Sequence, residues 1–389
     1  MGVVRDPTVF LTGFPGFLGS ALLERLLSRG DGPVACLVQP KYADVARERA
    51  REIAANVRGT ESESVGRIGS DDDADAVETV SDDGDADAIR LVEGDITDPD
   101  LGLGDDRDAL DAVTELYHLA AVYDLGVERD LAEAVNVRGT EHVLALAESL
   151  DVDRFHYVST CYVSGRYDGV FTADHLREGQ SFNNHYEETK YRAEVAVQER
   201  MAEGFPATIY RPAIVVGDSE TGETEKFDGP YNLLQLILAQ PRLLSATFTL
   251  PNSADAELNV VPRDFVVDAI AHISARGDAV GEVYQLCDPA PLSVPAFVDA
   301  LADATDHRTV RLPTTMGIAT AATNALDRLG IESDPHTFPY LDHPTRYACP
   351  NTTRALAGSD VSVPPFESYV DRLVAFAREH PDIRDEPMI

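Results

Sequence analysis

The sequence predicts an α/β fold in which a doubly wound parallel sheet carries a smaller carboxy-terminal lobe. Short apolar runs alternate with helical stretches over the first 212 residues, and a glycine-rich turn joins the first run to the first helix. Strands and helices that alternate in this way form a parallel sheet covered by helices on both faces. At 389 residues the chain is long enough to bury a sizeable core. A Rossmann-type fold is therefore expected.

The expected elements follow one another along the chain. Residues 8–11 form an apolar run, residues 21–28 continue as a helix with leucines on one face, and residues 33–38 form a second buried strand. Further strands are expected at 89–95, 116–121, 155–160 and 207–212, with helices at 42–56, about 127–150 and from 186 onward.

Beyond residue 212 the regular alternation ends, and glycine and proline become frequent. We therefore expect a nucleotide-binding domain at 1–212 and a substrate-binding lobe at 213–389. Residues 258–290 contain one more apolar run and are expected to return to the sheet.

The charge of the chain limits its partners and its surroundings. The formal net charge is −36, from 68 acidic and 32 basic residues, which disfavours nucleic acid and anionic membranes as partners. Such self-repulsion is tolerable where salt shortens the Debye length, to about 3 Å near 1 M, so a halophilic, salt-rich cytoplasm is expected. An acidic insert at 69–88 has too little apolar surface to fold by itself and is predicted to be a solvated surface loop.

Cysteine spacing and hydropathy add two expectations. The four cysteines lack metal or redox spacing and are expected to be reduced thiols: Cys36, Cys161, Cys287 and Cys349. No charged-then-apolar leader is visible, and no apolar run approaches the roughly 20 residues that span a bilayer. A soluble, cytoplasmic protein without a membrane span is predicted, as a monomer or a homodimer.

The glycine-rich turn predicts a dinucleotide site. It consists of Thr12, Gly13, Phe14, Pro15, Gly16, Phe17, Leu18 and Gly19. Glycines at this spacing let the backbone turn sharply and approach a pyrophosphate, whose charge is met by the N–H groups and the positive dipole end of the following helix.

A tyrosine and a lysine four residues apart supply candidate chemistry. Only three lysines occur in the chain, and one of them, Lys190, follows Tyr186 at helical spacing. Both side chains then lie on one face, where the ammonium is expected to lower the pKa of the phenol. Alone, such a pair is usually a surface pair. The pair indicates an active site when a hydroxyl lies near it at the carboxyl end of a strand, where parallel sheets bind ligands. Thr160 is the first candidate for this hydroxyl, and Ser159 is the second.

Together these motifs resemble the extended short-chain dehydrogenase/reductase superfamily over most of the first 290 residues. The matching elements are Gly13-x-x-Gly16-x-x-Gly19, Gly94-Asp95-Ile96, His118-Leu-Ala-Ala121, Asn136-Val-Arg-Gly-Thr140, Ser159-Thr160, Tyr186-x-x-x-Lys190 and Arg211-Pro212. Within the superfamily, the fatty acyl-CoA reductase and thioester reductase branch looks most similar, on Ser159-Thr-Cys-Tyr-Val163, Tyr186-Glu-Glu-Thr-Lys190, Val216-Gly-Asp-Ser219 and Asn259-Val-Val-Pro-Arg-Asp264.

The resemblance implies a role for each matching residue. Tyr186 would be the general acid/base, Lys190 would hold the nicotinamide ribose and tune Tyr186, and Thr160 would polarise the substrate carbonyl. The remaining positions would contact or order the cofactor: Asp95 and Ile96 at the adenine, Ala120 and Ala121 at its middle, Asn136 at the neighbouring strand end, and Pro212, Ala213 and Ile214 at the nicotinamide.

The second strand favours NADP(H) over NAD(H). An acidic residue about 20 positions after the glycines would accept the ribose 2′-OH of NAD. This chain has Gln39 there, followed by Lys41, and an uncharged amide with a lysine suits a 2′-phosphate. A solvated Lys41 without such a role stays open.

The substrate is predicted less sharply. The apolar helix at 233–238 would cover the acyl chain of an acyl-CoA or a carrier-bound thioester, or would simply be a core helix. A nucleotide-sugar epimerase remains an alternative. The dehydratases of the same superfamily usually have Asp-Glu directly after the threonine, whereas this chain has Cys161-Tyr162, which counts against a dehydratase. A non-catalytic cofactor sensor is a third possibility. His118 and His185 have no companions at metal spacing, so no metal is predicted.

Overall fold

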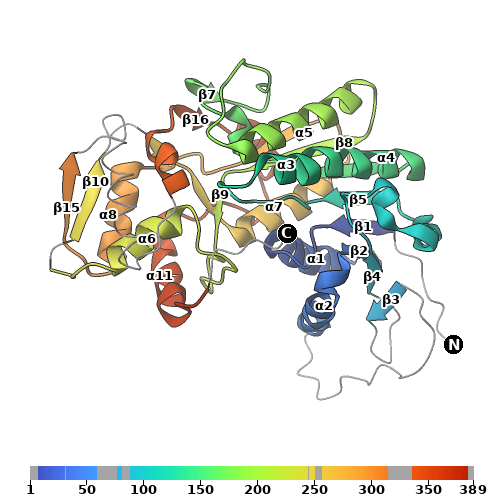
Figure 1. Ribbon diagram of the computed structural model, residues 1–389, viewed down its shortest axis with the longest axis horizontal. Helices are drawn as coiled ribbons and strands as arrows, with labels where there is room; N and C mark the ends of the chain where they lie inside the picture. Colours follow the sequence, from blue (N-terminus) through green and yellow to red (C-terminus); the bar gives the residue numbers. More distant parts are fainter. Residues whose placement is uncertain are drawn as a thin grey trace.

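An eight-stranded sheet organises the computed structural model, which describes residues 8–30, 32–58, 77–80, 88–243, 245–249, 256–313 and 335–383. The strand order is β13-β8-β6-β5-β1-β2-β4-β3. Every neighbouring pair is parallel except β3 and β4, so seven strands run together and β3 is an antiparallel edge (Figure 1). The predicted Rossmann-type α/β fold is confirmed.

The strands of this sheet are β1 (Val9–Thr12), β2 (Val34–Val38), β3 (Val77–Val80), β4 (Ile89–Glu93), β5 (Glu115–His118), β6 (Arg154–Val158), β8 (Ala207–Pro212) and β13 (Val283–Leu286). The helices around it are α1 (Phe17–Arg29), α2 (Ala43–Arg58), α3 (Arg129–Ala132), α4 (Thr140–Leu150), α5 (His185–Ala202), α7 (Arg263–Ser274) and α10 (Pro350–Ala355). A π-helical stretch, Glu133–Gly139, joins α3 to α4, so the expected long helix is present.

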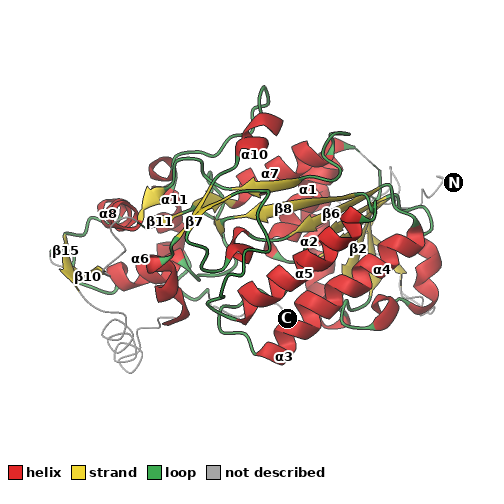
Figure 2. Cartoon of the chain, turned by 90° about the horizontal axis from the view of Figure 1, so that it is seen from above, coloured by secondary structure: helices red, strands yellow, loops and turns green. Residues whose placement is uncertain are grey.

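Helices cover both faces of the sheet because its strands are apolar on both sides (Figure 2). In β1, Val9 and Leu11 join the core beneath α1, α2 and α7, whereas Phe10 joins the core beneath α4 and α5. All three side chains are buried. This alternation with a period of two assigns each residue to one face.

A further group of elements follows β8, and most of them pack around a second core. Its elements are β9 (Ile214–Val216), α6 (Pro230–Leu238), β10 (Ser245–Thr249), β11 (Glu257–Leu258), β12 (Val260–Pro262), β14 (Leu292–Ser293), α8 (Val294–Ala304), β15 (Thr309–Pro313), the 3-10 helix η6 (Pro335–Asp342) and α11 (Val370–Glu379). Two short strands, β7 (Gly169–Phe171) and β16 (Thr345–Tyr347), pair with each other. Among the described residues, no helix is both long enough and apolar enough to cross a bilayer.

Two segments beyond residue 212 pack on the sheet. Strand β13 lies beside β8, with Val283 opposite Ile209, and α7 packs against α1. Residue 212, the expected domain boundary, thus lies between β8 and β13 in the sequence, although the two strands are neighbours in one sheet. The division into two domains stays a prediction.

The acidic insert contains one regular element. We expected residues 69–88 to form a loop, yet Val77–Val80 pairs antiparallel with β4, Val77 lying opposite Val92. The edge of β4 offers unpaired backbone groups, and a short stretch with two valines and a threonine suits a strand. The expectation is corrected for this stretch; residues 69–76 and 81–87 lie outside the described part of the chain.

Candidate functional site

The glycine-rich turn connects β1 to α1 under tight steric limits. Gly13 has φ +96°, and a Cβ there would lie 2.9 Å from the backbone nitrogen of Ala120. A Cβ on Gly19 would lie 2.2 Å from the carbonyl oxygen of Gly13. Gly16, the N-cap of α1, has no side chain to occupy the first N–H groups of the helix. The backbone donors at the start of α1 therefore fit a pyrophosphate.

A buried hydrogen-bond chain fixes the strand ends beside this turn. The Thr12 hydroxyl lies 2.8 Å from Nδ1 of His118 and accepts from the Ala120 N–H, while Nε2 of His118 lies 3.0 Å from the Thr140 hydroxyl. That hydroxyl donates to the Asn136 carbonyl, so it accepts from His118. Burial lowers the pKa of His118 to about 3. A neutral histidine thus joins β1, β5 and α4, a structural role that the sequence did not indicate.

Asn136 ties the chain after β5 to α5. Its Oδ1 accepts from the Val122 N–H at 2.9 Å, and its Nδ2 donates to the Val122 carbonyl and the Thr189 hydroxyl. Ala120 and Ala121 are half-buried and directly precede Val122, which Asn136 holds. Asn136 is in position to order the strand end.

Tyr186 and Thr160 meet at the carboxyl end of the sheet. Asn184 caps α5, which places Tyr186 in the first turn with 8% of its surface exposed. Burial raises the pKa of Tyr186, and the interaction with the nearby Thr160 hydroxyl opposes that shift. The Thr160 hydroxyl is also within 3.5 Å of the Pro212 carbonyl, at the end of β8.

Ser159, the alternative hydroxyl, is engaged elsewhere. Its Oγ donates to Glu194 at 2.5 Å, and Glu194 forms a fully buried ion pair with Arg211 at 2.6 Å. Of the two hydroxyls, the structure thus brings Thr160 to Tyr186.

Lys190 is buried against the end of β6. Its Nζ donates to the Val158 carbonyl at 2.9 Å and lies 4.5 Å from the centre of the Tyr157 ring. Burial lowers the pKa of Lys190 to about 7, and Glu194 opposes that shift. We expected the ammonium to lower the pKa of Tyr186; instead burial dominates and raises it, and Lys190 is not among the groups that shift it.

The lowered pKa of Lys190 makes stability depend on pH. Between about pH 7 and the ordinary pKa of 10.5, the unfolded chain binds a proton that the folded chain does not, so the free energy of unfolding rises with pH. Relative to Lys190→Met, the wild type should gain up to about 3 kcal/mol between pH 7 and pH 9.5, measured by urea unfolding. If the free energies of unfolding of the two proteins change in parallel with pH, the lowered pKa of Lys190 is contradicted.

Gln39 and Asp95 meet at the ends of β2 and β4. Gln39 donates from Nε2 to Asp95 at 2.9 Å, and Asp95 also accepts from Thr97. Oε1 of Gln39 is buried without a partner in the described structure. Lys41 is exposed, 5.1 Å above the Tyr42 ring. An unpartnered acceptor and a nearby cation fit the adenosine end of a dinucleotide.

The remaining predicted cofactor residues differ in exposure. Ile96 is buried, and a Cβ on Gly139 would lie 2.8 Å from it. Pro212 and Ala213 are buried behind Thr160, whereas Ile214 is half-buried and lines a cavity. Ile96 therefore packs beneath the π-helical stretch rather than at an open surface.

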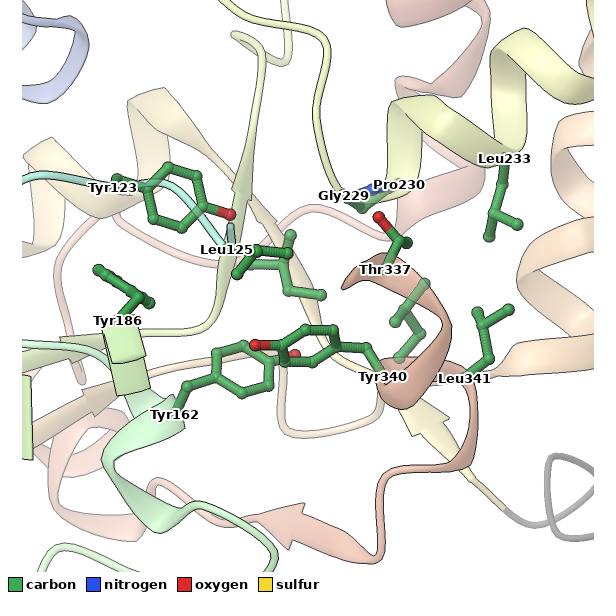
Figure 3. Close-up of a pocket in the computed structure, with 12 residues that line it drawn as sticks. Tyr123, Leu125, Tyr162, Tyr186, Gly229, Pro230, Leu233, Thr337, Tyr340 and Leu341 are labelled. Atoms are coloured by element: carbon green, nitrogen blue, oxygen red, sulfur yellow. The ribbon is translucent and has the colours of Figure 1, made fainter. Parts of the chain in front are cut away.

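A cavity that opens toward solvent begins at Tyr186 (Figure 3). Its wall includes three further tyrosines, Tyr123, Tyr162 and Tyr340, and none of the described residues that line it is charged. Leu233, from the predicted apolar helix, also lines it. Tyr123 and Tyr162 lie next to predicted motifs and could have been suspected, but nothing in the sequence pointed to Thr337, Tyr340 and Leu341 of η6.

The glycine turn, Thr160, Tyr186 and Lys190 all lie within a region that matches a known family. Residues 11–270 match the model of the family described as Male sterility protein, an NAD-binding domain, which is more than half of the chain. The chain belongs to this family. Nicotinamide-cofactor binding is thereby supported, and the predicted reductase branch agrees with it.

Curated relatives of this Male sterility family member are larger proteins. The non-canonical nonribosomal peptide synthetase FrzA of Cladobotryum sp is 28% identical over 293 residues, covering 72% of this chain and 26% of FrzA. The aldehyde reductase lnaA of Aspergillus flavus is 31% identical over 295 residues, again 72% of this chain and 26% of the relative. The chain thus spans about a quarter of the length of these relatives.

Solved structures support the same fold. The terminal R domain of the myxalamid PKS-NRPS pathway aligns with a TM-score of 0.77 at 24% identity, covering 98% of this chain and 92% of that domain. UDP-glucuronic acid 4-epimerase from Bacillus cereus aligns with a TM-score of 0.61 at 14% identity, covering 96% and 98%. Both identities are low, so these likenesses concern the fold.

Proposed function

We propose that the chain is an NADPH-dependent reductase that acts on an acyl thioester or a related carbonyl. One observation carries the proposal: Tyr186, whose hydroxyl is close enough to Thr160 for the two to interact, lines an apolar cavity next to the chain segments expected to hold the cofactor. The Male sterility family and reductase-named relatives add support. The cofactor, when bound, supplies the hydride.

Each of the site residues has a separate role in binding the cofactor or in the reaction. The N–H groups at the start of α1 would bind the pyrophosphate, and the Thr160 hydroxyl would donate to the carbonyl oxygen of the substrate. Tyr186 would give its proton to that oxygen as negative charge develops there. Lys190 would hold the nicotinamide ribose. The apolar wall excludes water and takes up the acyl part of the substrate.

The substrate and its carrier are part of this proposal. An acyl-CoA and an acyl group on a carrier domain both present a thioester, and the relative FrzA is named as a peptide synthetase. A sugar-nucleotide epimerase is less favoured, because the diphosphate of its substrate needs charged or N–H donors, and the described residues that line the cavity include no charged side chain. Monomer and homodimer, and a cytoplasmic, salt-rich setting, stay predictions.

The test is NADPH oxidation in molar KCl with an acyl-CoA thioester, a matched aldehyde and a UDP-hexose in separate assays, with NADH in parallel. Oxidation with the thioester or the aldehyde supports the proposal and shows how many reduction steps occur. Tight NADPH binding without oxidation in any assay would overturn it in favour of epimerisation or cofactor sensing.

Lys41 is expected to favour NADPH over NADH. It is exposed at the end of β2, and Asp95 is already hydrogen-bonded to Gln39 and Thr97. A charge-assisted contact with the 2′-phosphate contributes about 1.5 kcal/mol or more, so Lys41→Ala should weaken NADPH binding by about tenfold or more and leave NADH binding unchanged. Fluorescence titration of both cofactors measures this. Equal losses for the two would reject the role of Lys41.

A further inference from the structure

Tyr340 belongs to the cavity wall but comes from a distant part of the chain. It lies in η6, and its ring stands perpendicular to that of Tyr162, at 4.9 Å between centres (Figure 3). Leu341 and Thr337 of the same short helix also line the cavity. The position of η6 therefore decides how much room lies beyond Tyr186.

The hydroxyl of Tyr340 is held by the catalytic helix. It donates to Oε1 of Glu187 at 2.7 Å and accepts from Nδ2 of Asn184 at 2.9 Å. Glu187 directly follows Tyr186, and its side chain is fully buried. The proposed acid/base and the anchor of the wall are thus consecutive residues of α5.

The Glu187 carboxylate is built into a dedicated site. Besides Tyr340, it accepts from the backbone N–H of Asn183 at 2.7 Å and from Nδ2 of Asn183 at 3.0 Å. Burial raises the pKa of Glu187, whereas Tyr340, Asn183 and the charge of Arg166 lower it. Burying a carboxylate is costly unless its hydrogen bonds are made. Glu187 does not line the cavity, so the reaction gives no other reason for its burial.

A second link joins the same two segments. Arg166 donates from Nη1 to the side chain of Asn183 at 3.3 Å and from Nη2 to the carbonyl of Asp342, the last residue of η6, at 3.2 Å. The start of α5 and the end of η6 are therefore connected at two points of η6, Tyr340 and Asp342.

We propose that Glu187 is a positioning residue that sets the acyl-group selectivity of the cavity by holding Tyr340 in its wall. This inference rests on the proposed reductase function, because selectivity is read from turnover. Glu187 acts through Tyr340 and does not touch the reacting atoms. When it no longer accepts from Tyr340, η6 keeps only the link through Arg166 and can shift, and the cavity discriminates less between short and long acyl chains.

Three variants test the proposal: Glu187→Gln, Tyr340→Phe and the double variant. Tyr340→Phe keeps the ring and removes only the hydroxyl. Glu187→Gln replaces one of two accepting oxygens with an N–H donor, which then faces either the backbone N–H of Asn183 or the donors Tyr340 and Nδ2 of Asn183. Each single variant should raise KM for the preferred thioester roughly tenfold, change kcat less than about threefold, and move the ratio of kcat/KM for dodecanoyl-CoA to butanoyl-CoA toward one. Because both act through one contact, the double variant should be no worse than the more impaired single variant.

Glu188→Gln is the matched control, because Glu188 follows on the same helix and makes a partly exposed ion pair with Arg129 at 3.1 Å. It should leave KM and selectivity unchanged. Losses that add in the double variant, or a fall in kcat at unchanged KM, would overturn the proposal.

Hydrogen exchange separates this inference from the proposed function. Peptides that cover residues 335–342 should exchange faster in Glu187→Gln and Tyr340→Phe than in wild type or Glu188→Gln. That readout needs no turnover. If no thioester is reduced by the wild type, the reductase proposal fails, while unchanged exchange in both variants would remove the anchoring role of Glu187.

Discussion

Tyr186→Phe is expected to lower kcat for carbonyl reduction by about 10²- to 10⁴-fold, the usual contribution of a positioned general acid. Phenylalanine keeps the ring, which packs edge-on against Tyr123 at 5.0 Å between centres, and removes only the proton donor. Because burial raises the pKa of Tyr186, the phenol is protonated at neutral pH and ready to donate. Steady-state kinetics in molar KCl would measure the loss.

Cofactor binding shows whether Tyr186→Phe has lost only the proton donor or whether its fold is also disturbed. The dissociation constant of NADPH, followed by nicotinamide fluorescence, should change less than about threefold in Tyr186→Phe, a difference below 1 kcal/mol. Tyr191→Phe is the control, since Tyr191 lies on the same helix and packs against Phe182. Normal turnover by Tyr186→Phe would eliminate the proposed acid/base.

Arg211→Met is expected to cost about 3–5 kcal/mol of the free energy of unfolding, because it leaves the buried Glu194 carboxylate without its cation. The Arg211 and Glu194 side chains are both fully buried. Arg211 also donates to the carbonyls of Thr172 and His175, and Glu194 accepts from Ser159 and Gln198. The pair thus joins β8, α5 and the segment after β7.

Urea unfolding at constant KCl tests this, with Arg177→Met as the matched control. Arg177 pairs with Glu199 at 2.5 Å, but more than half of each side chain is exposed, so its loss should cost less than about 1 kcal/mol. Adding Glu194→Leu to Arg211→Met should recover part of the loss, because no charge is then buried alone. Equal costs for Arg211→Met and Arg177→Met would refute the prediction.

Three of the buried cysteines lie close together in the structure, although their spacing in the sequence does not indicate it. The cysteines have no spacing that suggests a cluster, and all four are free and buried. Cys287 nevertheless interacts with both Cys161 and Cys349. Strand pairing and the packing around β13 bring these residues together from positions more than 60 apart in sequence, a proximity that no local pattern reports.

Sequence patterns alone predicted the parallel sheet, the glycine turn and the placement of Tyr186 and Lys190 on one helix. Hydrophobic periodicity and glycine spacing report the conformation of consecutive residues, and parallel strands direct their carboxyl ends to one edge. The tertiary structure shows that Thr160 rather than Ser159 meets Tyr186, because Ser159 donates to Glu194 on α5, which pairs with Arg211 on β8. It also decided that η6 closes the cavity and that Glu187 holds Tyr340, 153 residues away. Such contacts depend on how whole elements pack, and packing leaves no periodic trace in the sequence.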